Sequence, residues 1–368
     1  MIKNSHTNQL VFLISQPRAG STMTQKILGG HSGIHTQSEP WILLHPLHAL
    51  REDNINASYN QNYYRIALED FCANLPGGKE QYIETIAAAY YSFYESILEQ
   101  NNKNIFLDKT PRYYLIIEEL LEYFPESKII LLIRNPMAVL NSIISTWSGN
   151  DLSKLANFKQ DLLLAPEIFV KYMQKGSGNI LSVKYENLIT APDDAVRDIA
   201  RYLDVEYEAG MINYGDEPAA DGEWKFGDQE TVYKKIKPDA KHAEAWINAM
   251  HEPQIWRLQK EYFEALGPDI FQSLGYEPGN IEAIIEDTRP AKSALKCTHS
   301  LTAFLEVQGR SQLPSRKVRQ AAPISRSKEY ILGYVILHPV KAFIRIIRRL
   351  YIGIKNVIYH DVSDKNVN

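Results

Sequence analysis

The sequence predicts an α/β protein whose central parallel sheet is covered by helices on both faces. Two runs of mainly apolar residues, at 10–14 and 128–133, have the continuous character of strands that are buried on both sides. Helical patterns separate the predicted strands, and this alternation is typical of parallel α/β domains. The composition, with 45% hydrophobic and 23% charged residues in 368, is that of an ordinary globular protein and excludes collagen and wholesale disorder.

Residues 1–124 contain two of the predicted strands. The strand at 10–14 leads through a turn at 15–20 into a helix at 21–28. Residues 60–100 are predicted to form two helices, and in the second of them the apolar residues between Ile83 and Leu98 recur at helical spacing. A short strand at 105–107 and a helix at 113–124 follow.

Residues 128–275 continue the alternation. The strand at 128–133 ends shortly before Pro136, which fits the first position of a helix. A fourth strand is predicted at 179–183 and a helix at 193–203. The stretch 205–235 is rich in glycine, acidic and aromatic residues without periodicity, so we predict a long loop; such loops are usually functional or disordered. Helices resume across 240–275.

The net charge of −4 is the sum of two very different parts. Residues 291–368 hold 14 basic and four acidic residues, a charge of +10, whereas residues 1–290 hold 26 basic and 40 acidic residues, a charge of −14. Between 289 and 327 the composition shifts to serine, glutamine, proline and arginine, as in flexible linkers. We therefore predict a domain at 1–288, a basic flexible linker at 289–327 and a basic amphipathic helical segment at 328–368.

The C-terminal segment suggests a partner. Residues 328–360 mix aliphatic and aromatic residues with lysine and arginine, which suits a helix lying on an anionic membrane surface. Packing of this face against the domain or a second subunit is the alternative, and the sequence leaves the oligomeric state open. Nucleic acid is not expected as a partner, because the basic residues accompany aliphatic residues rather than forming a polar stripe.

Cysteine usage and the N-terminus bear on location. Cys72 and Cys297 lie far apart without a neighbouring histidine cluster, so the sequence predicts no metal site and fits a reducing compartment. The N-terminal residues are polar, and no run of about 18 apolar residues occurs anywhere. The expected location is therefore cytoplasmic, with peripheral attachment to the membrane through the basic segment.

The loop at 15–22, Ser-Gln-Pro-Arg-Ala-Gly-Ser-Thr, joins the first buried strand to a helix. In this position a loop can direct backbone N–H groups and the positive end of a helix at a phosphate. Gly20 allows close approach of the backbone, Arg18 supplies charge, and Ser21 and Thr22 supply hydroxyl groups. A Walker A loop carries a lysine before its serine or threonine, and this loop has none, so a magnesium–nucleoside-triphosphate site is disfavoured. A tight turn with a solvated arginine is the alternative.

A second anion site is predicted after the strand at 128–133. Arg134 falls at the carboxyl end of this strand, where α/β sheets place their ligands. Asn135 is suited to cap the following helix and Pro136 to begin it. Ser142 lies two turns into that helix, within reach of an anion that Arg134 also binds. The alternative is that Arg134 only covers the edge of the sheet.

Together these two elements resemble the sulfotransferases that use 3′-phosphoadenosine 5′-phosphosulfate (PAPS). Residues 17–22 are similar to the family's 5′-phosphosulfate loop, usually Pro-Arg/Lys-Ser/Ala-Gly-Thr/Ser-Thr, and Arg134 with Ser142 is similar to its 3′-phosphate site. The resemblance covers about residues 8–275 and implies a P-loop-type three-layer fold, PAPS as co-substrate and no metal. Tyr185, in Val-Lys-Tyr-Glu-Asn, resembles a nucleotide-contacting tyrosine. The implied PAPS-binding residues are Arg18, Ala19, Gly20, Ser21, Thr22, Arg134, Ser142 and Tyr185.

The resemblance also indicates the catalytic residues. Where cytosolic sulfotransferases have Lys-Thr/Ser-His with histidine as base, this chain has Lys-Thr-Pro, and Pro111 replaces the histidine. Glu39 follows the phosphate-loop helix by about ten residues, as does a glutamate in the tyrosylprotein and many bacterial or Golgi-type carbohydrate sulfotransferases. The resemblance thus implies Glu39 as general base, with Lys109 and Arg18 stabilising the developing charge. His31 and His35 are the rival bases.

These residues predict transfer of a sulfuryl group from PAPS to a hydroxyl or amine. The acceptor can be a carbohydrate, lipid, peptide or small metabolite, and its loops are expected at 30–60 and 205–235. Two other functions remain open at this point. One is a P-loop kinase or NTPase, and the other is a membrane-recruited nucleotide-binding protein without transfer activity.

Overall fold

The computed structural model describes residues 9–51, 59–149, 151–176, 178–213, 237–238, 243–296 and 298–305. Most of the predicted loop at 205–235 lies outside these ranges, and so does the whole basic segment at 328–368. The expectations for that segment therefore stay predictions. Among the described helices, none combines the length and apolar character needed to cross a membrane.

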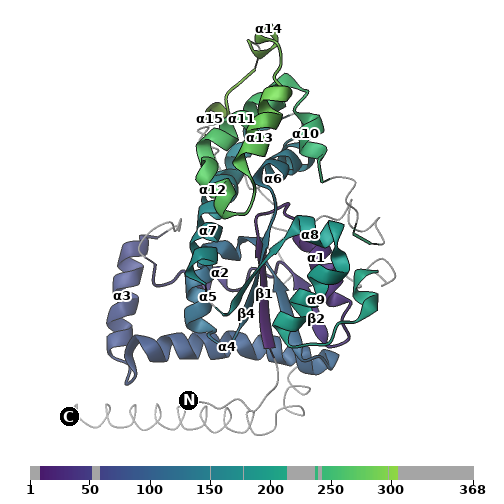
Figure 1. Ribbon diagram of the computed structural model, residues 1–368. Coiled ribbons are helices and arrows are strands. Elements are labelled where there is room, and N and C mark those ends of the chain that lie inside the picture. The colour runs from purple at the N-terminus through teal and green to yellow at the C-terminus, as the bar shows by residue number, and fades with distance from the viewer. Residues whose placement is uncertain are drawn as a thin grey trace, which may run out of the picture. The chain divides into compact units, whose positions relative to one another are not determined.

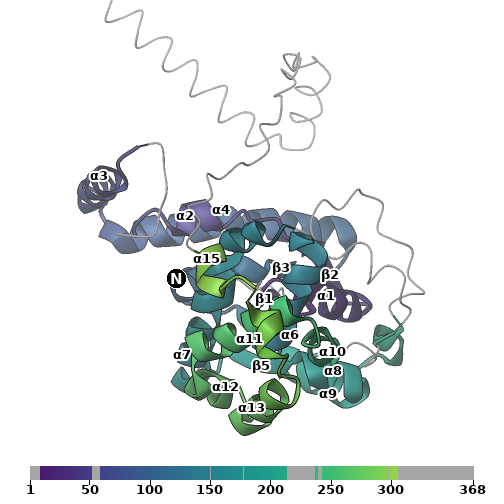
Figure 2. The same ribbon diagram turned by 90° about the horizontal axis from the view of Figure 1, so that it is seen from above.

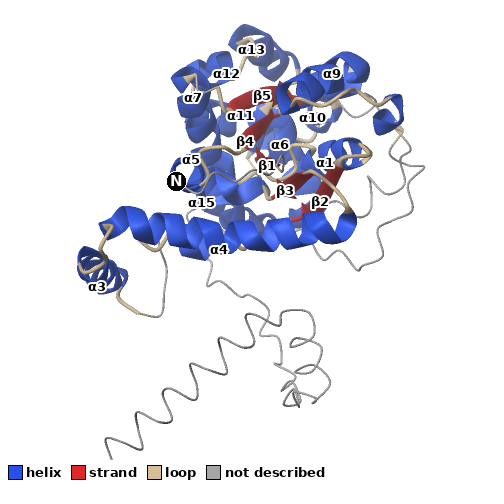
Figure 3. Cartoon of the chain, turned by 90° about the horizontal axis from the view of Figure 1, so that it is seen from below, coloured by secondary structure: helices blue, strands red, loops and turns tan. Residues whose placement is uncertain are grey.

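Five parallel strands form the central sheet. In the order β2-β3-β1-β4-β5 they span Ile34–Ser38, Ile105–Lys109, Gln9–Ser15, Lys128–Ile133 and Ile180–Lys184 (Figure 3). The four predicted strands are confirmed. Strand β2 was not predicted, because this edge strand reads Ile-His-Thr-Gln-Ser and buries only Ile34 fully, so it has no continuous apolar run.

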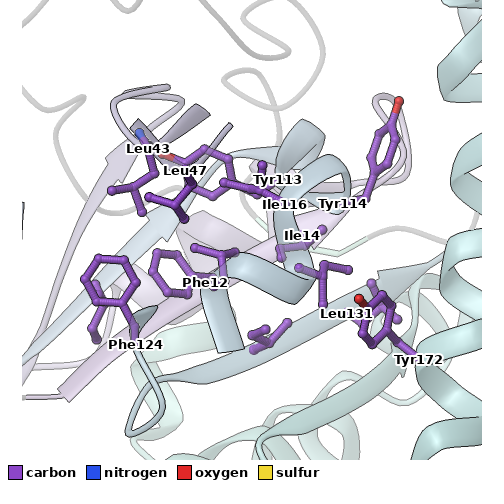
Figure 4. Packing of buried hydrophobic residues seen from close by; sticks show 14 of the residues in the cluster. Phe12, Ile14, Leu43, Leu47, Tyr113, Tyr114, Ile116, Phe124, Leu131 and Tyr172 are labelled. Carbon is purple, nitrogen blue, oxygen red and sulfur yellow. Dashed lines mark hydrogen bonds between the residues drawn. The ribbon is translucent and has the colours of Figure 1, made fainter. Parts of the chain in front are cut away.

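Both faces of the sheet are buried, which explains the apolar runs. Along β1, Leu10, Phe12 and Ile14 belong to one hydrophobic core, whereas Val11 and Leu13 belong to another. This alternation follows from the two-residue period of a strand. Figure 4 shows the first core, in which Phe12 and Ile14 pack with Leu43, Leu47 and aromatic residues of neighbouring elements.

Helices form a layer on each face of the sheet (Figure 1). Gly78–Asn101 (α4), Ile117–Tyr123 (α5) and Ala165–Lys175 (α7) contribute to the first core. Ser21–Gly29 (α1), Tyr185–Thr190 (α8) and Pro192–Leu203 (α9) contribute to the second. The protein is thus a three-layer α/β fold in which β1 leads through a glycine-containing loop into α1, as in P-loop proteins.

Helix α6 and the helices after residue 244 build a third core (Figure 2). It comprises α6 (Pro136–Ile143), α10 (Ala245–Ala249), α11 (Pro253–Leu266), α12 (Pro268–Ser273), α13 (Pro278–Asp287) and α15 (Leu301–Leu305). Leu301 and Leu305 of α15 are buried in this core. Together with α14 (Lys292–Leu295), α15 lies within the range predicted as linker.

The remaining elements are short or lie at the periphery. They are α2 (Leu44–Leu47), α3 (Gln61–Ala73), the 3₁₀ helices η1 (Pro111–Ile116), η3 (Leu152–Phe158) and η5 (Ala209–Ile212), and the π-helical turns η2 (Ile144–Ser148) and η4 (Gln160–Leu164). The helix predicted over 113–124 is therefore a 3₁₀ turn followed by α5. π-helical turns are rare and often occur at functional sites.

Candidate active site

The candidate site residues gather at the carboxyl ends of the strands. Arg18 follows β1, Glu39 follows β2, Lys109 is the last residue of β3, Arg134 follows β4 and Tyr185 follows β5. Because all five strands are parallel, these ends share one edge of the sheet. Ligands of open α/β sheets bind at this edge.

The loop after β1 has the conformation of an anion cradle. Gly20 has φ +97° and serves as the N-cap of α1, and Arg18 also lies in the left-handed region with φ +69°. A glycine N-cap has no side chain to accept from the first helical amides, so these donors can bind an anion. Ala19 and Ser21 are buried, whereas Thr22 is partly exposed.

Tyr185 and Arg134 stack on this loop. A β-carbon added to Gly20 would lie 2.3 Å from Cδ2 of Tyr185, so only glycine permits the ring to pack there. The guanidinium carbon of Arg134 lies 4.5 Å from the centre of the same ring. Arg134 Nη1 also donates to the carbonyl oxygen of Arg18 at 2.8 Å. Residues that follow β1, β4 and β5 are therefore joined in one unit.

Ser142, in α6, contacts the arginine of the phosphate loop. Arg18 donates to Ser142, with Nε 3.1 Å from Oγ. Arg18 Nη2 donates to Oγ1 of Thr146 at 3.1 Å, and its guanidinium carbon lies 5.4 Å from the ring centre of Trp147. The π-helical turn η2 supplies both of these contacts, so it orients the arginine of the phosphate loop.

Glu39 and Lys109 form an ion pair at the ends of neighbouring strands. The register of β2 and β3 aligns Ser38 with Lys109, which brings Glu39 alongside. Lys109 Nζ donates to Glu39 Oε1 at 2.9 Å, and the two side chains are 0% and 13% exposed. The pKa of Lys109 is lowered, because the effect of burial exceeds that of the charge and hydrogen bond of Glu39, which raise it. The pair places a carboxylate and a cation side by side at this edge.

Glu39 and Trp41 lie in a strained turn. Both are non-glycine residues in the left-handed region, with φ of +50° and +57°. The amide of Glu39 donates to the carbonyl oxygen of Lys109 at 2.7 Å, and the indole Nε1 of Trp41 donates to Glu39 Oε2 at 3.3 Å. A left-handed conformation costs roughly 1–3 kcal/mol of folding free energy for each non-glycine residue, and such residues are concentrated at functional sites. These contacts hold the turn in place.

Sequence reasoning missed Arg112 and Asp161 at this site. Arg112 donates to both carboxylate oxygens of Asp161, with Nε–Oδ1 at 3.0 Å and Nη2–Oδ2 at 2.7 Å. Burial alone would lower the pKa of Arg112, but the hydrogen bonds and charge of Asp161 raise it above its usual value. The Arg112 guanidinium carbon lies 5.6 Å from the ring centre of Trp41. No local pattern pairs two residues that are 49 positions apart.

The rival bases lie elsewhere. His31 is in the loop before β2, where its Nδ1 accepts from the amide of Gly33 at 2.9 Å. His35, the second residue of β2, packs on Phe106 with ring centres 5.3 Å apart. At about 3.3 Å per residue, His35 is roughly 13 Å along the strand from Glu39. The histidines therefore lie toward the amino end of β2, whereas Glu39 lies at its carboxyl end.

Beside Lys109, Asp108 lies in a fully buried hydroxyl cluster. Its carboxylate accepts from Tyr94 at 2.8 Å, Thr110 at 2.7 Å and Tyr113 at 3.3 Å. Burial raises the pKa of Asp108 from 3.8 to about 6, although the three hydroxyl groups and Lys109 act in the opposite direction. The cluster fixes the end of β3 from which Lys109 projects.

Asp108 is expected to make the protein's stability depend on pH. Because its folded pKa is raised, the folded state holds a proton that the unfolded state has lost between pH 3.8 and about 6. Its contribution to the free energy of unfolding therefore falls as pH rises through this window, by about 3 kcal/mol in total. Urea unfolding from pH 4 to pH 7 should show this loss in the wild type and not in Asp108→Asn. Parallel curves for the two proteins would contradict it.

Comparisons with known proteins point to one family. The family model described as "Sulfotransferase family" matches residues 10–209. Nodulation protein NoeE of Sinorhizobium fredii is 27% identical over 293 residues, which cover 73% of this chain and 66% of the relative. Protein-tyrosine sulfotransferase A of Caenorhabditis elegans is 25% identical over 290 residues, covering 74% and 69%. These matches span about two thirds of the relatives' lengths.

Two solved structures are similar at lower levels. The sulfotransferase domain from the curacin biosynthetic pathway has a TM-score of 0.47 and 20% identity, covering 74% of this chain and 99% of that domain. Mouse sulfotransferase SULT7A1, complexed with PAP, has a TM-score of 0.43 and 12% identity, covering 77% and 88%. The family model matches more than half of the chain and includes the phosphate loop, Glu39, Lys109, Arg134 and Tyr185. The chain therefore belongs to the sulfotransferase family of transferases.

Proposed function

We propose that this protein transfers the sulfuryl group of PAPS to a hydroxyl or amine of an acceptor, with Glu39 as general base. The observation that carries the proposal is the Glu39–Lys109 pair at the edge of the sheet that also holds the phosphate loop. Sulfuryl transfer needs a base for the acceptor proton, positive charge around the transferring group and in-line placement. By analogy with phosphoryl transfer, positioning and electrostatics supply most of the catalysis.

The donor side is built from the loop, α1 and the Gly20–Tyr185–Arg134 stack. In this proposal the first amides of α1 and the hydroxyl groups of Ser21 and Thr22 bind the 5′-phosphosulfate. Arg134 and Ser142 bind the 3′-phosphate, and Tyr185 contacts the nucleotide. The contact of Arg18 with Ser142 supports this arrangement, since it brings the two predicted phosphate sites next to each other.

On the acceptor side, Glu39 takes the acceptor proton as the acceptor's oxygen or nitrogen forms its bond to sulfur. The bond from sulfur to the bridging phosphate oxygen breaks at the same time, and adenosine 3′,5′-bisphosphate leaves. Lys109 orients the Glu39 carboxylate through its hydrogen bond to Oε1, and with Arg18 it stabilises charge on the leaving oxygen. Some relatives act on protein tyrosine according to their names. For this chain the proposed acceptor is a carbohydrate, lipid, peptide or small metabolite.

A kinase or NTPase is disfavoured by two observations. The family model that matches the chain is that of sulfotransferases, and no lysine precedes the Ser21–Thr22 pair. A binding protein without transfer activity is disfavoured by the presence of the complete Glu39, Lys109 and Arg134 set in one edge of the sheet.

The test is transfer from ³⁵S-labelled PAPS to pools of lipids, saccharides, peptides and small alcohols or amines, without added metal. Calorimetric titration with adenosine 3′,5′-bisphosphate measures donor-site binding separately. We expect label in one acceptor pool and binding of the bisphosphate. Hydrolysis of ATP with magnesium, in a protein that neither binds the bisphosphate nor transfers the label, would overturn the proposal.

Arg134→Ala should weaken binding of adenosine 3′,5′-bisphosphate. Loss of a charged hydrogen bond costs about 1.5–3 kcal/mol, which corresponds to about a 10- to 150-fold higher dissociation constant. The same calorimetric titration measures it. Arg197→Ala is the matched control, since Arg197 also stacks on a tyrosine, Tyr207 at 3.9 Å, but on the exposed side of α9. Equal affinities of the Arg134 variant and the wild type would remove Arg134 from the donor site.

A further inference from the structure

We propose that Asp161 is a positioning residue for the Glu39 carboxylate and that it acts through Arg112 and Trp41. The proposal rests on the function proposed above, because Glu39 matters most if it is the base. Asp161 lies in the π-helical turn η4, 122 positions from Glu39. A continuous series of side-chain contacts nevertheless joins the two carboxylates.

Asp161 is itself firmly held. Asp161 is 2% exposed, and its Oδ1 accepts from the hydroxyl of Tyr114 at 2.8 Å in addition to Arg112. Its backbone carbonyl accepts from Nε2 of Gln16, in the phosphate loop, at 2.8 Å. The carboxylate therefore has a fixed position relative to the loop after β1. A bidentate arginine–carboxylate pair also fixes the plane of the guanidinium group.

Arg112 transmits this position to Trp41. Its guanidinium carbon lies 5.6 Å from the indole centre, within the range of about 6 Å for a cation–π interaction. Trp41 needs such support, because its φ of +57° is unfavourable for a tryptophan. The charge of Glu39 contributes to the raised pKa of Arg112, so the guanidinium is also electrostatically coupled to the proposed base.

Trp41 then fixes the orientation of Glu39. The carboxylate is held at both oxygens, Oε1 by Lys109 at 2.9 Å and Oε2 by the Trp41 indole at 3.3 Å. Each carboxylate oxygen has a further lone-pair site, so a base held in this way can still accept a proton. If Asp161 cannot hold Arg112, the indole loses its contact with an oriented guanidinium, and its hydrogen bond to Oε2 is weakened. Transfer should then slow without loss of donor binding.

The competing explanation is that Asp161 and Arg112 form an ordinary structural ion pair. The chain contains a matched pair for comparison, since Arg51 also donates to both oxygens of Glu119. The arginines are 27% and 29% exposed and the carboxylates 3% and 13%. Glu119 lies in α5, and its pair has no link to Trp41 among the described contacts. Asp161→Asn and Glu119→Gln therefore remove the same kind of charge.

The first test measures the NMR resonance of the Trp41 indole N–H. ¹⁵N-labelled tryptophan in the full-length protein gives one indole N–H resonance for each of the five tryptophans, and Trp41→Phe identifies that of Trp41. We expect this resonance to shift in Asp161→Asn and to stay in place in Glu119→Gln, with unchanged affinity for adenosine 3′,5′-bisphosphate in both. An unmoved resonance in Asp161→Asn, or an equal shift in both variants, would overturn the proposal.

The second test is a double-mutant cycle on turnover with the acceptor found in the labelled-PAPS screen. Asp161→Asn should lower kcat by about 10- to 100-fold, as expected for a misplaced catalytic group. In a Trp41→Phe background it should cause no further loss, whereas losses that multiply would overturn the proposal. Absence of transfer by the wild type would overturn the proposed function instead, and the indole resonance decides the positioning role independently of activity.

Discussion

Glu39→Gln is expected to abolish sulfuryl transfer while leaving the binding of adenosine 3′,5′-bisphosphate intact. Glutamine keeps an oxygen that can accept from Lys109 but cannot take the acceptor proton, and a positioned general base contributes about 10²–10⁴ in rate. Single-turnover transfer from labelled PAPS measures the chemical step, and calorimetry measures binding. Turnover equal to that of the wild type would exclude Glu39 as the base.

Two controls separate catalysis from folding. The variant leaves the Lys109 cation, which is 0% exposed, without its carboxylate, and breaking a buried pair can cost about 3–5 kcal/mol. Unfolding curves must therefore show that the variant is folded at the assay temperature. His35→Asn changes a rival base in β2, the strand that precedes Glu39. This variant should keep its activity, because His35 packs on Phe106, away from the carboxyl ends of the strands. Loss of transfer in this variant alone would assign the base to His35.

The strands that are buried on both faces of the sheet were predictable from the sequence. β1 and β4 are covered on both faces and read as uninterrupted apolar runs, so they could be found without any knowledge of the rest of the chain. The edge strand β2 is mostly partly exposed and reads as a polar segment, so it was missed. Glu39 was nevertheless predicted as a site residue from its motif, and the structure explains its location by the strand that precedes it.

The pairing of side chains was less predictable than their identity. The contact between Arg18 and Ser142 was not predicted, and the guanidinium of Arg18 also contacts Thr146 and Trp147 of the π-helical turn η2. Asp161 and Arg112 meet through another π-helical turn, η4. π-helical turns have no recognisable sequence period, and their contacts depend on tertiary packing, so no local pattern could have revealed either pairing.

Gly20→Ala is expected to lower both stability and nucleotide binding, because it breaks the unit that joins the loop to Tyr185 and Arg134. The new β-carbon would lie 2.3 Å from one carbon of the Tyr185 ring and 2.5 Å from another. The ring cannot move freely, since Arg134 lies on it at 4.5 Å. Overpacking costs about 1–3 kcal/mol, and a left-handed alanine adds about 1–2 kcal/mol. Urea unfolding and titration with adenosine 3′,5′-bisphosphate measure the two effects.

Gly176→Ala separates the cost of a left-handed alanine from the cost of the collision with the Tyr185 ring. Gly176 ends α7 with φ +62°, and a β-carbon there would meet nothing within 4 Å. This control should lose only the cost of a left-handed alanine and bind the nucleotide normally. In the double variant Gly20→Ala/Tyr185→Ala the ring that collides with the new β-carbon is gone, so part of the stability lost by Gly20→Ala should be recovered. Nucleotide binding should not be recovered, because Arg134 then lacks the ring on which it stacks. Additive stability losses in the double variant would mean that the ring and the loop are not packed together.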